Sequence, residues 1–577
     1  MTIDWPLTRA VVLAFGLFRL VLSIDNAQAF PADDQTGSFG PSARESLSGQ
    51  DAQDLKHQMQ IVTGTASASS SGGWVIVPRL DLLGLVTDNA LQVSNPRQWD
   101  IGSIVAPGLA MTADTGRLQL RFDYSPILSV YARTSSQNSL SHYLNTSGLL
   151  TVVPDLFFVD LRAVAGVQPI SGGFGGINGF GLGLAQASGL GASIANSAIL
   201  NRQNQSQVLT AGISPYVVRD FGDYGILRIG GSLQASSQST VSGFGTVPLT
   251  TTGDDVQSQI TTEQTARFIT GDILGRIQNT TEGTLSQTPI SSTIAASGRQ
   301  FGRSYSSQQI ITNKTAYAIN HAITVFATIG YQNLVYSGGL NQSVTGLVWN
   351  IGTTLLPNPD SSITVSYGRR DGAESLAFDA KYSVSARTVI AGSYSSSLTT
   401  QLQNLQRQLD MGILNANGIL VNSQTGAPLI IGNGGQALQP GLFRYDVLNL
   451  TAQTTLDRDF VTLAVISSTQ RPTIGSTTTS ATTVKTISGS WVRELRPDLS
   501  LNTILSYTTQ TVSGASGVGK TLAASIGLNY LLTDSLTGRL RYSYFNRQAG
   551  AAIAINPAFS RFSFSQNLLT IGITKLF

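Results

Sequence analysis

In the stretch RLQLRFDYS, from Arg117 to Ser125, apolar and polar residues alternate at every position. The two leucines, Phe122 and Tyr124 fall on one side, and the two arginines, Gln119 and Asp123 fall on the other. A period of two is typical of a β-strand that buries one face only. The alternation recurs at residues 157–163, 227–234, 323–332, 378–382 and 539–544. The sequence therefore predicts many strands, each with one apolar face.

Soluble β-sandwiches also alternate, so the connections between strands decide the fold class. Tight turns are predicted at residues 114–116, 154–155, 222–223, 320–321, 357–360, 457–459, 497–498 and 533–534. Longer polar connections lie between them, at residues 166–205, 237–261 and 398–441. Short turns at one rim and long loops at the other are typical of outer-membrane barrels. We therefore predict an all-β fold, a transmembrane antiparallel up-and-down β-barrel with short periplasmic turns and long extracellular loops.

The number of strands follows from the position of the two chain ends. If both ends lie in the periplasm, the number is even, and the turns then require one extra strand between Thr280 and Arg299, for a total of about 22 strands. Alternation is poor from Thr262 to Ala296, and without that pair the total is about 20 strands. The first strand is expected from Trp74 to Val86.

The composition excludes several classes of protein. The chain has 577 residues, of which 41% are hydrophobic and 12% charged, with a net charge of +3, so disorder is not expected. It contains no cysteine, which excludes disulfides, thiolate zinc sites and iron–sulfur clusters. Three histidines are too few for a histidine metal cluster, and the small charge gives no basic stripe for nucleic acid. We expect no metal, no cofactor and no nucleic-acid partner.

The N-terminal residues predict the compartment. Arg9 precedes the apolar run Ala10–Leu22, and Ala27-Gln28-Ala29 follows as a small-x-small site, so residues 1–29 are predicted to be a cleaved signal peptide. An uncleaved anchor is the alternative, but the run is shorter than the ~20 residues that a spanning helix needs. Residues 30–73 are expected to form a mostly disordered periplasmic tether, too short for a barrel-filling plug domain. The barrel would then occupy residues 74–577.

The C-terminus resembles the last strand of outer-membrane barrels. Phe577 ends the chain, and Leu569, Ile571 and Ile573 precede it at alternate positions, although Lys575 departs from the pattern. The resemblance implies that Phe577 is an assembly signal for the barrel-assembly machinery. The outer-membrane lipid of a Gram-negative bacterium is the expected surroundings.

Several short segments of the sequence resemble those of a known family. They are Val86–Asn89, Ala106–Gly108, Pro154–Asp160, Ser395–Leu409, Thr425–Gly426 and Trp491–Pro497. They are similar to those of outer-membrane β-barrels associated with exosortase (PEP-CTERM) and exopolysaccharide systems. The resemblance implies a role beside polysaccharide export, with polysaccharide and an export complex as partners.

Two glycine-rich segments invite a functional interpretation. Gly514–Thr521 matches the phosphate-binding loop GxxxxGK[ST], but that loop should follow a buried strand and open a helix. Here the residues after Lys520 alternate as a strand does, so a surface loop and no nucleotide partner are expected. Gly172–Gly183 lacks the GxGxxG spacing and is expected to be a mobile extracellular loop. Alternatively, its two phenylalanines, Phe174 and Phe180, stack on a sugar ring.

The connection at residues 398–442 is predicted to contain a short helix. Leucines lie on one face from Leu398 to Leu409, and glutamines, among them Gln403, lie on the other. This helix would either pack on the barrel rim or fold into the mouth, where its amides could narrow a pore.

No enzyme is expected, because His142 and His321 lie at strand or turn positions without a nucleophile motif. The alternation instead assigns charged residues to the water-filled lumen. These lumen candidates are Arg117, Arg121, Asp123, Asp160, Arg162, Arg228, Arg370, Asp379, Lys381, Arg539 and Arg541. Basic residues outnumber acidic ones, which favours anions over cations. Alternatively, the charges pair among themselves to stiffen the wall, and both interpretations can hold together.

Two functions fit these patterns. The first is a porin-like outer-membrane channel for exopolysaccharide or another anionic or polar solute. The second is a structural or adhesive barrel that acts through its extracellular loops.

Overall fold

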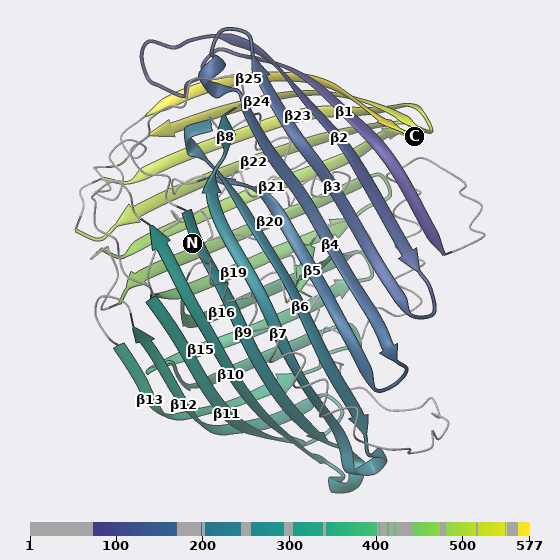
Figure 1. Ribbon diagram of the computed structural model, residues 1–577, viewed down its shortest axis with the longest axis vertical. Coiled ribbons are helices and arrows are strands. Elements are labelled where there is room, and N and C mark those ends of the chain that lie inside the picture. The colour runs from purple at the N-terminus through teal and green to yellow at the C-terminus, as the bar shows by residue number, and fades with distance from the viewer. Residues whose placement is uncertain are drawn as a thin grey trace, which may run out of the picture. The chain divides into compact units, whose positions relative to one another are not determined.

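The chain folds into a barrel of long antiparallel strands (Figure 1). The computed structural model describes residues 73–169, 198, 202–243, 256–293, 304–337, 342–400, 403, 412–414, 420–422, 442–473, 480–514, 517–548, 550 and 563–577. All of them belong to one compact unit, Ala43–Phe577. The predicted signal peptide and tether lie outside the described residues, apart from Gly73. No helix in these described ranges is long and apolar enough to cross a membrane.

Twenty-two strands form the wall. They are β1 (Trp74–Thr87), β2 (Asp100–Asp114), β3 (Leu118–Tyr131), β4 (Ser139–Val153), β5 (Phe157–Pro169), β6 (Gln205–Asp220), β7 (Gly225–Thr240), β9 (Val256–Thr270), β10 (Ile277–Thr293), β11 (Ser304–Ala318), β12 (Ile323–Ser337), β13 (Gln342–Leu355), β14 (Ser362–Arg370), β15 (Ala373–Ser385), β16 (Thr388–Thr399), β19 (Phe443–Thr455), β20 (Asp459–Pro472), β21 (Thr482–Arg496), β22 (Leu499–Val512), β23 (Gly519–Thr533), β24 (Leu536–Gln548) and β25 (Phe564–Leu576). Three shorter strands, β8 (Ser242–Gly243), β17 (Gly412–Leu414) and β18 (Leu420–Asn422), lie in loops.

Each wall strand pairs with its neighbours in sequence, and the barrel closes where β25 pairs with β1. The pairing at this seam runs from Arg79 opposite Leu576 to Thr87 opposite Leu568. Closure leaves no open edge, so every spanning backbone group can be bonded within the protein, as a bilayer requires. The predicted count of 22 strands is therefore confirmed, and the alternative of 20 is excluded.

The weakly alternating segment after Thr262 is part of the wall. β9 and β10 pair along their length and are joined by the turn η4 (Asp272–Leu274). β9 also pairs with β7, and β10 with β11. Partners on both sides explain why strands form here although the local pattern is poor.

Short turns and long connections lie at opposite rims, as predicted. Turns such as those at residues 115–117, 154–156 and 534–535 join strands at one rim, which we call the short-turn rim. The first residue of β1, Trp74, pairs with Ala113 beside the first of these turns, and β25 ends near it, so both ends of the barrel lie at this rim. The long connections lie at the other, the long-loop rim.

The outward face of the strands is apolar and exposed. Ile351 and Ile571 are 64% and 66% exposed, and aliphatic and aromatic residues with this orientation recur around the wall. An apolar surface of this extent on a closed barrel is covered by lipid. The protein is therefore an outer-membrane β-barrel of a Gram-negative envelope.

Close packing between strands gives a first prediction. A Cβ added to Gly330 of β12 would collide with the carbonyl oxygen of Ile311 in β11, whereas a Cβ added to Gly283 of β10 would meet nothing within 4 Å. We expect Gly330→Ala to lower the free energy of unfolding by about 1–3 kcal/mol, since the backbone must shift. Gly283→Ala, the matched control, should change it by less than about 0.5 kcal/mol. Urea unfolding in lipid vesicles measures both, and equal losses would contradict the described register.

Candidate functional site

The inward side of the wall can be identified from the strand register. Residues directly opposite each other in an antiparallel pair share a face, and the face alternates along each strand. Asp81 of β1 lies opposite Thr574 of β25 and opposite Ala106 of β2. On the same face as Thr574, Arg539 of β24 lies opposite Asn529 of β23. Followed around all the wall strands, the pairing returns to the same face of β1. This face carries the buried polar residues.

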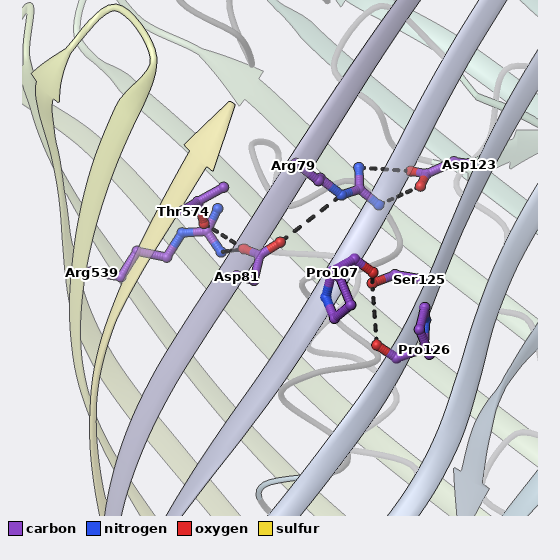
Figure 2. A network of polar contacts seen from close by, with 8 residues as sticks. All are labelled: Arg79, Asp81, Pro107, Asp123, Ser125, Pro126, Arg539 and Thr574. Carbon is purple, nitrogen blue, oxygen red and sulfur yellow. Dashed lines mark hydrogen bonds and ion pairs between the residues drawn. The ribbon is translucent and has the colours of Figure 1, made fainter. Parts of the chain in front are cut away.

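A chain of alternating charges crosses the seam on this inner face (Figure 2). Arg79 donates from Nη1 to Asp123 Oδ2 at 3.1 Å, and its Nη2 contacts the other oxygen of the same carboxylate. Asp81 lies between two cations, with Oδ2 3.9 Å from Arg79 Nε and Oδ1 3.7 Å from Arg539 Nη1. Thr574 of β25 donates its hydroxyl to Asp81. Ion pairs therefore link β3, β1 and β24 across the line of closure.

Small residues in β2 make room for this chain of charges. A Cβ on Gly108 would lie 2.7 Å from Arg79 Nε, so a larger residue there would displace the Arg79 side chain. Pro107 has no backbone N–H, and the paired register with β3 is interrupted there. The Ser125 hydroxyl donates to the Pro107 carbonyl oxygen at 2.7 Å and satisfies it (Figure 2).

The register places the lumen candidates on the inner face, with two of them at rims. Asp160 and Arg162 of β5 form an ion pair at 3.3 Å. Arg117 lies in the turn before β3, and Arg370 is the last residue of β14. The others lie within strands, on the same face as Asp81: Arg121, Asp123, Arg228, Asp379, Lys381, Arg539 and Arg541.

Other inward charges were not identified from the sequence. They are Arg79, Arg267, Lys314 and Arg547 among the cations, and Asp81, Asp100, Asp114, Asp220, Glu263, Glu282 and Glu494 among the acids. With the eight basic and three acidic candidates from the sequence, the excess of cations on the inner face falls from five to two. Arg79 and Asp81 were missed because apolar residues occur on both faces of β1, which hides its parity. Glu263, Arg267 and Glu282 were missed because they lie in the weakly alternating segment.

The inward cations form a belt near the short-turn rim. Leaving aside Arg370 and Arg547, each lies no further than the sixth residue from the short-turn end of its strand: Arg79, Arg121, Arg162, Arg228, Arg267, Lys314, Lys381, Arg539 and Arg541. At about 3.3 Å per residue along tilted strands, the belt lies within roughly 15 Å of that rim. Arg121, Lys381 and Arg541 form no ion pair with any described residue. The belt is therefore only partly neutralised.

A second sector of the inner wall carries hydroxyl and amide groups instead of charges. Within the described residues of β16 and β19 to β23, Glu494 is the one inward charge. Buried atoms of this sector have no hydrogen-bond partner in the described part of the chain: Thr462 Oγ1, Gln470 Nε2 and Oε1, Ser490 Oγ, Asn502 Oδ1, Ser506 Oγ and Ser525 Oγ. We call it the hydroxyl wall. Hydroxyl and amide groups of this kind can hydrogen-bond water.

The connection after β16 reaches into the mouth of the barrel. Thr400 Oγ1 donates to Gln259 Oε1 of β9 at 3.4 Å, and Gln403 Nε2 donates to Thr288 Oγ1 of β10 at 3.0 Å. Both acceptors lie on the inner face, and β11 to β15 separate them from β16. Thr400 and Gln403, the described residues at the start of this segment, therefore bond across the mouth. Most of the predicted helix lies outside the described residues.

The hairpin between β14 and β15 also folds toward this mouth. Asp371 is buried, its N–H donates to Gln332 Oε1 at 3.1 Å, and its Oδ2 accepts from the Leu398 N–H at 3.3 Å. Arg444 Nη2 donates to the Asp371 carbonyl oxygen at 2.7 Å. The long-loop end of the lumen is thus narrowed by bonded segments of the chain.

The motifs considered for catalysis form no reactive arrangement in the described residues. His142 Nδ1 lies 3.0 Å from the Tyr124 hydroxyl, and His321 lies in a turn. Lys520 and Thr521 of the GxxxxGK[ST] match lie in strand β23, where that loop would require a helix. No three His, Asp or Glu side chains in the described ranges could hold a metal ion. The glycine run at residues 172–183 lies outside the described residues.

No protein-family model matches the chain. No curated protein matches it in sequence either.

Solved structures of an iron transporter and of an import receptor are similar to this chain. The apoprotein form of the FrpB iron transporter (F5-1 variant) from Neisseria meningitidis is similar at a TM-score of 0.51 and 9% identity, over 90% of this chain and 83% of that chain. The F3-3 variant gives 0.49 at 10% identity, over 90% and 83%. The ferric-catecholate import receptor Fiu from E. coli K12 gives 0.46 at 10% identity, over 86% and 81%. The likeness to the apoprotein form of FrpB concerns the fold alone.

The ion pairs at the seam should stabilise closure. Arg79→Met leaves Asp81 and Asp123 without their shared cation, and we expect a loss of about 3 kcal/mol in the free energy of unfolding, as for a broken buried pair. Arg79→Met combined with Asp123→Leu should recover a large part of it, because the lone carboxylate is removed. Urea unfolding in vesicles measures both.

An exposed ion pair provides the matched control. Arg387 Nη1 lies 2.8 Å from Asp457 Oδ1 in the turn region, with side chains 61% and 83% exposed. Arg387→Met should cost less than about 1 kcal/mol. A loss equal to that of Arg79→Met would mean that the seam pairs contribute no more than a surface pair.

Proposed function

We propose that the protein is an outer-membrane channel for an anionic, hydroxyl-rich solute, and that exopolysaccharide is the class of solute. The observation that carries this proposal is the division of the inner wall into a cation belt and a hydroxyl wall. Acidic polysaccharide presents carboxylates and hydroxyls along one chain, and the two sectors offer partners for each. The sequence resemblance to barrels of exopolysaccharide systems favours the same solute, and an export complex as partner.

The position of the belt supports passage from the periplasmic side. Short turns lie in the periplasm in outer-membrane barrels, so an anion arriving there meets the cations first. A positive wall beside low-dielectric protein concentrates anions at the entrance. The lumen candidates then act as the selective surface, in particular the unpaired Arg121, Lys381 and Arg541.

An adhesive barrel is the second candidate. The bonds from Thr400 and Gln403 to the inner face of β9 and β10 favour it, because they narrow the mouth. In that case the long loops would act at the cell surface and the lumen would be closed.

Ion selectivity tests the channel proposal. In a planar bilayer with a salt gradient, the reversal potential should show a mild preference for anions, since cations are in excess on the inner face. Combining Arg121→Gln, Lys381→Gln and Arg541→Gln should shift the permeability ratio several-fold toward cations. Lys485→Gln, which removes a charge from the outer face, is the control and should leave it unchanged. A wild-type preference for cations would refute the proposal.

Loop deletion separates the two candidates. Replacing residues 400–441 by a short glycine-serine linker removes Thr400 and Gln403, which bond to Gln259 and Thr288. A channel should then show a higher single-channel conductance, because its mouth widens. An adhesin should instead lose binding to its surface target, with conductance unchanged.

A further inference from the structure

Three neighbouring strands, β9, β10 and β11, interrupt the apolar outer face of the wall. Because Arg267 and Glu282 lie inward, the even residues of β9 and the odd residues of β10 and β11 face outward. Glutamine occupies this outer side near the middle of each strand, at Gln264, Gln287 and Gln309. All three side chains are exposed. We call the outer face of β9, β10 and β11 the amide strip.

On the far side of the barrel, the middle of the wall presents apolar side chains to lipid. Leu505 of β22 and Ile526 of β23 face outward there and are 55% and 49% exposed. A primary amide that faces hydrocarbon without a hydrogen-bond partner is costly, and lipid-facing positions of outer-membrane strands are therefore apolar as a rule. The three glutamines of the amide strip break this rule on adjacent strands.

Polar groups of the amide strip that lie closer to the short-turn rim satisfy one another. The side chains of Asn279 in β10 and Asn313 in β11 exchange hydrogen bonds of 2.8 and 3.1 Å. Thr281 and Thr315 accept from the same two amides at 2.9 and 3.0 Å. The side chains of the three glutamines, by contrast, form no hydrogen bond within the described part of the chain. Their hydrogen-bonding capacity is left for a group outside this barrel.

The amide strip carries no charge. No outward residue of β9, β10 or β11 is Asp, Glu, Lys or Arg. Anionic lipid headgroups bind to basic side chains, so the strip offers them no counter-charge. An amide both donates and accepts hydrogen bonds, which makes a row of amides complementary to another copy of itself. The chemistry of the strip therefore favours a second copy of this chain over a lipid headgroup or a charged partner.

We propose that the amide strip is the contact surface between two copies of this chain in the outer membrane. A two-fold axis along the membrane normal in front of β10 makes β10 face itself and places β9 against the partner's β11. Gln264 and Gln309 both lie opposite Leu285, in one row across the strip. Gln264 of one copy is then within reach of the partner's Gln309. Amides that lipid cannot satisfy bond to one another across the interface.

The area around the strip is large enough for a specific contact. The flanking strands add exposed apolar residues, Ile229 on β7 and Ile329 and Tyr331 on β12. Five paired strands, from β7 to β12, form a face roughly 20 Å wide, which over a hydrocarbon core of about 30 Å is on the order of 600 Å² per copy. Two copies would bury about 1,200 Å², the lower end of the range for specific interfaces.

Cysteine cross-linking of the full-length protein in lipid vesicles and in outer membranes tests the contact. The chain contains no cysteine, so a single introduced thiol cannot form a disulfide within one copy. Gln287→Cys lies on β10, next to the proposed axis, and oxidation should convert most of it into a covalent dimer. Leu505→Cys, also near the middle of its strand but on the far wall, is the matched control. It should give roughly five-fold less dimer, since thiols that do not meet cannot be bridged.

A second variant tests the physical reason for the contact. Replacing all three glutamines by leucine, as Gln264→Leu, Gln287→Leu and Gln309→Leu together, makes the strip as apolar as the rest of the wall. Dimerisation in vesicles should weaken roughly ten-fold or more, because lipid then solvates the strip as well as a partner does. Energy transfer between labelled copies at increasing lipid dilution measures this loss. The circular dichroism of the barrel should not change, since leucine is ordinary at lipid-facing positions.

Four results would overturn the proposal. They are a wild-type protein that stays monomeric in vesicles at every dilution, equal cross-linking of Gln287→Cys and Leu505→Cys, dimerisation unaffected by the triple leucine variant, and cross-linking of Gln287→Cys in outer membranes to a different protein only. The last would assign the amide strip to another partner instead of a second copy. None of these results depends on what passes through the lumen.

Discussion

Closure of the barrel by β25 against β1 is the constraint on which the rest of this structure depends. A lipid layer offers no hydrogen bonds to the backbone, so an open edge at either strand would leave a row of unsatisfied N–H and C=O groups. The seam register satisfies them and also fixes parity, because a shift of one residue would turn Arg79 and Asp81 of β1 toward lipid. The wall of 22 strands has one continuous apolar face only because the pairing of β25 with β1 keeps the same side of both strands outward.

The polar contacts of the inner wall follow from that parity. Once the outer face is given to lipid, the charged residues of each strand must lie inside, where they meet one another. Asp81 joins Arg79 and Arg539 at the seam, and Gly108 provides the space for the arginine. Charge at this point stabilises closure, whereas the unpaired cations further along the belt remain available to a solute.

The two ends of the lumen differ in character. Near the short turns the wall is charged and the described strands are joined by short turns only, so the strands themselves define the entrance. At the other rim the residues after β16 and the hairpin at Asp371 bond to inner-face groups and narrow the opening. Selection at one end and restriction at the other is a combination that suits a channel whose passage is controlled, and the hydroxyl wall lies along the path between them.

The sequence by itself determined the strands, their faces and the two rims, because alternation and turn chemistry are local properties. Arg117–Ser125 specifies one strand and its polar side without any partner. Tertiary structure decided which charges meet: Arg79 and Asp123 are 44 residues apart, and Asp81 and Thr574 are 493 apart. Tertiary structure also decided that β9 and β10 are strands of the wall. Their own alternation is weak, and their pairing with β7 and β11 holds them there. Contacts of this kind depend on register between distant segments, which no local pattern records.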